Sequence, residues 1–104
     1  MLLDKQKQLP YNTVMKLITG EEIITKVVEE NLEDYVIEKP LQMVIGAQGP
    51  QFAPFMMMAD PDKKIPLAKR SVVVSATPNP KLEEQYESLT SSIALPKKPS
   101  IITA

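Results

Sequence analysis

The amino-acid sequence is defined first by the residues that it lacks. It contains no cysteine, which excludes disulfides, thiol nucleophiles and zinc sites built on cysteine. It also contains no histidine, the commonest general base and metal ligand, so a Ser-His-Asp triad is excluded as well. Because no acid–base constellation is visible, we expect the protein not to be an enzyme and to hold neither a cofactor nor a metal.

A strong excess of charge of one sign is also missing. Twelve basic and thirteen acidic side chains leave a formal net charge of −1 at pH 7, which argues against nucleic-acid binding through bulk positive charge. The longest apolar run, residues 52–59, is interrupted by Pro54 and is far too short to span a bilayer. The first residues do not resemble a signal peptide. We therefore expect a cytoplasmic protein with no membrane contact.

The residues that are present predict one small, mainly β domain. Among 104 residues, 43% are hydrophobic, enough for a single modest core. Thr13–Ile18 and the β-branched segment Glu22–Glu30 flank a tight turn in which Gly20 can adopt a positive φ. This pattern predicts a β-hairpin.

Further extended segments follow the hairpin. A third strand starts at Tyr35–Glu38, is bent or bulged at Pro40, and continues through Leu41–Ile45. After a loop at residues 46–50, the pattern predicts a strand over 51–59 with a break at Pro54, a turn over 60–64, extended chain at 65–67 and a valine-rich strand over 71–76.

Helices are predicted at both ends of this β region. Residues 1–10 could form a short helix that ends at Pro10. Asn79 followed by Pro80 is typical of a helix start, with a capping side chain before a residue of preset φ. Beyond it, apolar side chains at helical spacing predict a face made of Leu82, Tyr86, Leu89 and Ile93 that is buried against the barrel or against a neighbouring subunit. Pro96 would end this helix, and residues 97–104 would form a flexible tail.

Two segments of the sequence resemble the Sm-like (LSm) family. V-M-K-L-I-T-G-E-E-I-I-T-K-V, running on to D-Y-V-I-E-K-P, is similar to the first family motif, and A-K-R-S-V-V-V-S-A is similar to the second. The later segments F-A-P-F-M-M-M-A-D and P-K-L-E-E-Q-Y-E-S-L-T-S-S-I-A-L-P most resemble short Sm-like proteins of tailed marine phages. Gly20 and the strand rhythm alone would also fit an SH3-like barrel.

The resemblance implies a fold and an assembly. The fold would be a small five-stranded, strongly bent antiparallel barrel of Sm-like (SH3-like) type. One domain would cover residues 1–96, with the barrel at about 12–76 and an added helix at about 79–95. Because a small barrel exposes its edge strands, which Sm-like proteins pair between subunits, the resemblance implies a homo-oligomeric ring of about five to seven subunits.

The resemblance also implies single-stranded RNA as a ligand. The basic pair Lys69 and Arg70 matches the family's ligand loop, and Tyr35 could stack on a base, as aromatic residues do in proteins that bind single strands. The alternative roles are a core tyrosine and a solvated turn. The chain departs from the family where Ile37 replaces an asparagine and where Ser71, after Arg70, replaces a glycine. These departures weaken the inference to RNA more than the inference to the fold.

Other residues point to protein contacts. Three consecutive methionines on a strand cannot all face a one-sided core, so we expect an oligomer interface at Met56, Met57, Met58, Val72 and Val74. Two functions therefore remain open. The first is RNA binding by a ring, in the cytoplasm of an infected bacterium if a phage encodes the protein. The second is a phage structural or assembly protein that uses the ring as a platform for other proteins.

Overall fold

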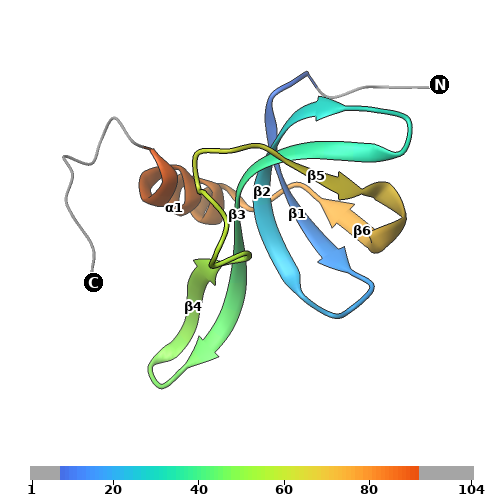
Figure 1. Ribbon diagram of the computed structural model, residues 1–104. Helices are drawn as coiled ribbons and strands as arrows, with labels where there is room; N and C mark the ends of the chain where they lie inside the picture. The colour runs from blue at the N-terminus through green and yellow to red at the C-terminus, as the bar shows by residue number, and fades with distance from the viewer. Residues whose placement is uncertain (1–7, 92–104) are drawn as a thin grey trace.

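The computed structural model describes residues 8–91 and shows one bent antiparallel sheet with a helix beside it (Figure 1). The sheet has six strands in the order β4-β3-β2-β1-β6, and β5 pairs with the first part of β3. The bounds of the elements are β1 Tyr11–Leu17, β2 Glu22–Glu30, β3 Asp34–Gly46, β4 Gly49–Pro54, β5 Ile65–Ala68, the 3-10 turn η1 Lys69–Ser71, β6 Val72–Ala76 and α1 Pro80–Thr90.

The predicted hairpin is confirmed as β1 and β2. The Leu17 N–H donates to the Glu21 carbonyl at 2.9 Å, and the Gly20 N–H donates back to the Leu17 carbonyl at 2.9 Å. Gly20 has φ +106°, in the left-handed region where only glycine avoids a steric penalty. The turn chemistry visible in the sequence therefore fixes the register of this hairpin.

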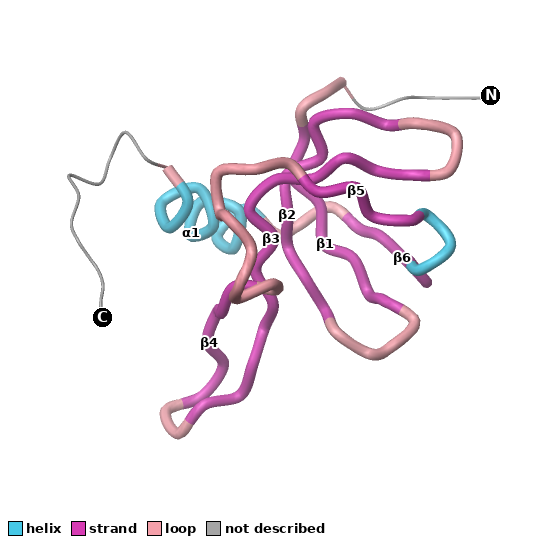
Figure 2. The backbone as a smooth tube through the Cα atoms, viewed as in Figure 1, coloured by secondary structure: helices cyan, strands magenta, loops and turns pink. Residues whose placement is uncertain are grey.

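The bend predicted at Pro40 is also confirmed, and it divides β3 into two halves. Lys39, just before the buried Pro40, has φ +49°, which turns the strand sharply. Residues 34–37 pair with β5, whereas residues 41–46 pair with β4. As a result the β3–β4 hairpin projects as an arm away from the rest of the sheet (Figure 2).

The core lies between the curved strands and is built from side chains that the alternating pattern places inside. Its buried members are Met15, Leu17, Ile23, Val27 and Ile37. The expected closed, five-stranded barrel is not observed. The chain crosses from β5 to β6 through η1, which is anchored by the Lys69 N–H on the Glu33 carbonyl and by the Ile18 N–H on the Ser71 carbonyl, both at 2.8 Å. No ladder joins β5 to β6 in the described part of the chain, so the sheet stays open.

Helix α1 starts as predicted. The Asn79 side chain accepts a hydrogen bond from the Leu82 N–H at 2.8 Å, and Pro80 follows it. Tyr86 is completely buried and Leu82 is half-buried, but Leu89 is 52% exposed, so it is not buried within its own chain. Leu89 lies in the last turn, which borders a cavity. Ile93 and the rest of the predicted helix lie outside the described residues.

The predicted strand over 51–59 is too long. Strand β4 ends at Pro54; the Phe55 N–H still donates to the Pro40 carbonyl at 3.0 Å, and then the chain turns. Met56, Met57 and Met58 therefore lie in a turn, with exposed fractions of 48%, 79% and 100%. The helix proposed for residues 1–10 falls mostly outside the described residues, as does the tail at 97–104. Within residues 8–91, no helix is both long and apolar enough to cross a membrane.

Candidate nucleic-acid interface

The structure brings together two of the three predicted RNA-contacting residues. Tyr35, near the start of β3, pairs with Leu67 of β5, so the chain that leaves β5 into η1 passes beside it. The Lys69 Nζ lies 5.2 Å from the centroid of the Tyr35 ring, within the range of a cation–π contact. Arg70 follows in η1 and is exposed. An aromatic ring flanked by cations can hold an unpaired base and its phosphate.

A carboxylate shares this site. Glu30 of β2 lies opposite Tyr35 in the ladder, and its Oε2 is 3.2 Å from the Lys69 Nζ. Its Oε1 accepts a hydrogen bond from the Tyr11 hydroxyl at 3.4 Å. Burial, together with the neighbouring Glu30 charge, raises the pKa of Tyr11 to about 12. Part of the Lys69 charge is therefore neutralised before any ligand binds.

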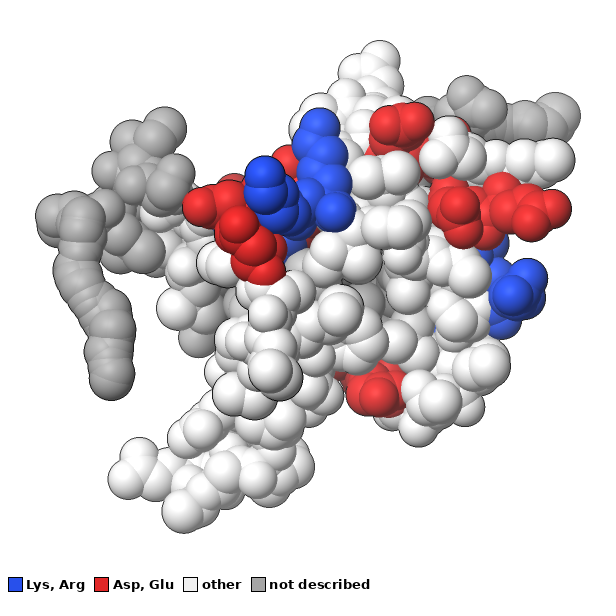
Figure 3. Space-filling model, in the orientation of Figure 1, with Lys and Arg blue, Asp and Glu red and all other residues white. Residues whose placement is uncertain are grey.

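The surroundings of the site carry both signs of charge. In Figure 3, acidic side chains gather over the β2–β3 turn and basic side chains lie beside them over η1. The ion pair between Lys69 and Glu30 is partly exposed, with 31% and 43% of the two side chains accessible. Exposed pairs of this kind are weak, about 0–1 kcal/mol, so a phosphate could displace Glu30 from Lys69.

The departures from the family pattern have structural explanations. Ile37 is completely buried in the core, so this position cannot reach a ligand. The Ser71 hydroxyl donates to the Ala68 carbonyl at 2.7 Å and closes the η1 turn. Any RNA contact on this surface therefore depends on Tyr35, Lys69 and Arg70, without help from these two positions.

The second basic pair of the sequence, Lys63 and Lys64, lies elsewhere. These residues belong to the loop between β4 and β5 and come before β5, whereas Lys69 and Arg70 follow it. Basic side chains accordingly form separate groups on the face shown in Figure 3. Sequence reasoning also missed Glu30 and Tyr11 as members of the site. Only the strand register places them there, and an alternation pattern does not specify which residues lie opposite each other.

The predicted interface residues lie on or near the edge strands β4 and β6. Within the described residues, β6 pairs only with β1, and β4 and β5 each pair only with β3. On β6, Val72 packs against the core, whereas Val74 is 55% exposed. The sequence did not single out Val73 and Ile45, which are also exposed. Open edges that carry exposed apolar side chains are a template for strand pairing.

The described residues contain no group of three acidic or imidazole side chains that could hold a metal ion. No protein-family model matches the chain, and no curated protein is significantly similar to it in sequence. The argument for a function therefore depends on the geometry of the site and of the sheet edges.

Proposed function

We propose that this protein is a non-enzymatic Sm-like protein that assembles into a homo-oligomeric cytoplasmic ring and binds single-stranded RNA through Tyr35, Lys69 and Arg70. One observation carries the proposal: β4 and β6 stand at opposite ends of the strand order, and each of them pairs with a neighbouring strand on one side only. Joining β6 of one copy to β4 of the next is a head-to-tail contact, and a rotation that closes gives a ring.

Assembly would compensate for the low charge of each subunit. With a net charge of −1, a single copy has little electrostatic attraction for a polyanion. A ring repeats Tyr35, Lys69 and Arg70 once in each subunit. Linked sites bind with a high effective concentration, so several weak contacts to one strand add up to useful affinity.

The second candidate, a platform for other proteins, is favoured by the β3–β4 arm. Residues 40–59 contain no charged side chain, and the arm projects from the sheet as an uncharged surface in Figure 3. Ile45 and Met58 are exposed on this segment. Exposed apolar surface of this kind is typical of protein contacts and not of phosphate binding.

Titration of fluorescent oligo-U and oligo-A at low salt tests the RNA proposal. We expect salt-sensitive binding that the double substitution Lys69→Ala/Arg70→Ala weakens for both sequences. Tyr35→Ala should weaken it by about 1–3 kcal/mol per stacked base. The matched control is Lys63→Ala/Lys64→Ala, which removes the same amount of charge from the other loop and should leave affinity almost unchanged.

The substitution Glu30→Gln gives a second test, because we expect it to increase the affinity for RNA. Without the carboxylate that pairs with it, Lys69 is free to meet a phosphate, so affinity should rise. If wild-type protein does not bind RNA at tens of micromolar, the platform function replaces RNA binding. If both basic double variants weaken binding equally, RNA is held by general charge and the Tyr35 site is wrong.

A further inference from the structure

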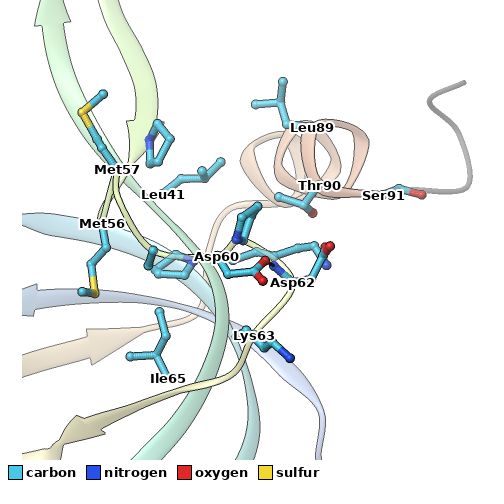
Figure 4. A pocket seen from close by; sticks show the side chains of 15 residues that line it. Leu41, Met56, Met57, Asp60, Asp62, Lys63, Ile65, Leu89, Thr90 and Ser91 are labelled. Atoms are coloured by element: carbon cyan, nitrogen blue, oxygen red, sulfur yellow. Dashed lines mark hydrogen bonds between the residues drawn. The ribbon is translucent and has the colours of Figure 1, made fainter. Parts of the chain in front are cut away.

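A cavity of about 380 Å³ lies beside the bend in β3, between the last turn of α1 and the loop that follows β4. Its apolar walls include Leu41, Met57 and Leu89, and Figure 4 shows Met57 and Leu89 on opposite sides of it. Met57 and Leu89 are 79% and 52% exposed, so the cavity wall presents apolar side chains to solvent. This volume lies within the range of small-ligand and peptide sites.

The described part of the chain ends at the wall of this cavity. Ser91, the last described residue, is part of the cavity wall. The residues that follow it begin S-I-A-L-P-K-K, with aliphatic side chains at Ile93 and Leu95. Extended chain advances about 3.3–3.6 Å per residue, so Leu95 is within about 14 Å of Ser91, which is itself part of the cavity wall.

The charges at the rim are compatible with this segment. Asp60 and Asp62 line the cavity, and neither forms an ion pair within the described residues. Lys39 and Lys63 on the same wall keep the rim neutral overall, so the main contribution must come from apolar contact. Lys97 and Lys98, which follow Leu95 after one proline, could then pair with the two aspartates.

We propose that this cavity is the docking site of the chain's own residues 92–98, with Ile93 and Leu95 packed between Met57, Leu41 and Leu89. Docking would cover apolar side chains that α1 and the loop leave exposed. It would also hold the last turn of α1 against the bend in β3. This contact lies on different residues from the RNA site, so it stands or falls separately from the proposed function.

Because the sequence contains no cysteine, a pair of introduced cysteines has no native thiol to react with. In the full chain, Met57→Cys/Leu95→Cys should form a disulfide within one molecule under mild oxidation, at least ten times faster than the matched pair Met57→Cys/Ile102→Cys. Non-reducing electrophoresis separates this product from a cross-linked dimer. Equal rates for the two pairs would overturn the proposal, and so would a product formed between chains, which would mean that a second copy occupies the cavity.

Thermal unfolding gives an independent measurement. Leu95→Asp places a charge in the apolar cavity and should lower the melting temperature by about 4 °C or more. Ile102→Asp, the same kind of change farther along the chain, should leave it unchanged. If Leu95→Asp and Ile102→Asp melt at the same temperature as the wild type, residues 92–98 do not occupy the cavity.

Discussion

Tyr86 connects helix α1 to the bend in β3. Its ring is completely buried, and its hydroxyl donates to the carbonyls of Glu38 at 3.2 Å and Lys39 at 2.9 Å. Those carbonyls belong to the segment where the strand turns and where β4 and β5 cannot pair with them. Burial raises the pKa of the Tyr86 hydroxyl, so it stays a protonated donor at any physiological pH.

Tyr86→Phe should therefore destabilise the fold although it removes a single oxygen atom. The Lys39 carbonyl loses this donor, whereas the Glu38 carbonyl keeps the hydrogen bond from the Thr25 hydroxyl at 2.8 Å. We expect a cost of about 1–3 kcal/mol in the free energy of unfolding. Urea denaturation measures this change. The control is Tyr35→Phe, because the Tyr35 hydroxyl makes no hydrogen bond that the described residues show. A Tyr86→Phe protein as stable as the Tyr35→Phe protein would mean that the hydroxyl does not support the bend.

At the scale of elements, α1 is also tied to the sheet by a polar cluster. The Asn12 Nδ2 of β1 donates to the Glu83 Oε2 at 2.9 Å and to the Glu87 Oε2 at 2.7 Å. The Lys26 Nζ of β2 lies 3.1 Å from the same Glu87 oxygen. The hydrogen bond from Asn12, followed by the one from Lys26, lowers the pKa of Glu87.

This lowered pKa predicts the direction of a pH dependence. A carboxyl with a lower pKa in the folded state adds stability above its unfolded pKa and loses that contribution as the pH falls through the folded value. Glu87→Gln should thus be less stable than wild type at pH 7, by less than about 1 kcal/mol because the pair is partly exposed. The difference should shrink as the pH falls to about 3, below the ordinary glutamate range.

Urea denaturation at both pH values measures this difference. Glu84→Gln removes the same charge from the same helix and serves as the control for the helix's overall charge. A Glu87→Gln difference that stays constant with pH after this control is subtracted would contradict the role of the cluster.

The side of β4 that faces away from β3 has few backbone N–H donors. Gly46 pairs with Gly49, and the Phe55 N–H bonds to the Pro40 carbonyl in the same register, so alternate residues of β4 face β3. Residues 50, 52 and 54 then direct their backbone groups outward. Two of the three are prolines, which leaves the Phe52 N–H as the single outward donor of this edge.

This pattern gives a sharp test of edge-to-edge assembly. Phe52→Pro removes the outward donor without touching a hydrogen bond to β3, so it should dissociate the ring into monomers. Phe52→Ala removes the same side chain but keeps the N–H, and it should remain assembled. Sedimentation velocity compares the two, with circular dichroism to confirm that both are folded. Two variants with the same mass would mean that β4 is not the assembling edge.

At the scale of the whole molecule, the sequence predicts local features such as turns and helix caps better than it predicts which distant residues contact one another. Gly20, Pro40 and the Asn79–Pro80 pair have turn and cap chemistry that acts over a few residues, and each acts as expected. The strand predicted at Met56–Met58 was wrong, and Leu89 is not buried within its own chain, because both depend on where α1 and the loop meet the bend in β3. Such a contact between elements is tertiary structure, which the periodicity of the sequence does not specify. Likewise, the pairing of Lys69 with Glu30 follows from strand register alone.

The central claim, assembly through the open edges β4 and β6, is tested most directly by the mass of the full-length protein in solution. Multi-angle light scattering at micromolar concentration should give a single species of about five to seven times the chain mass of 11.6 kDa. A single species of 11.6 kDa would contradict the ring and, with it, the route by which a chain of net charge −1 could hold RNA.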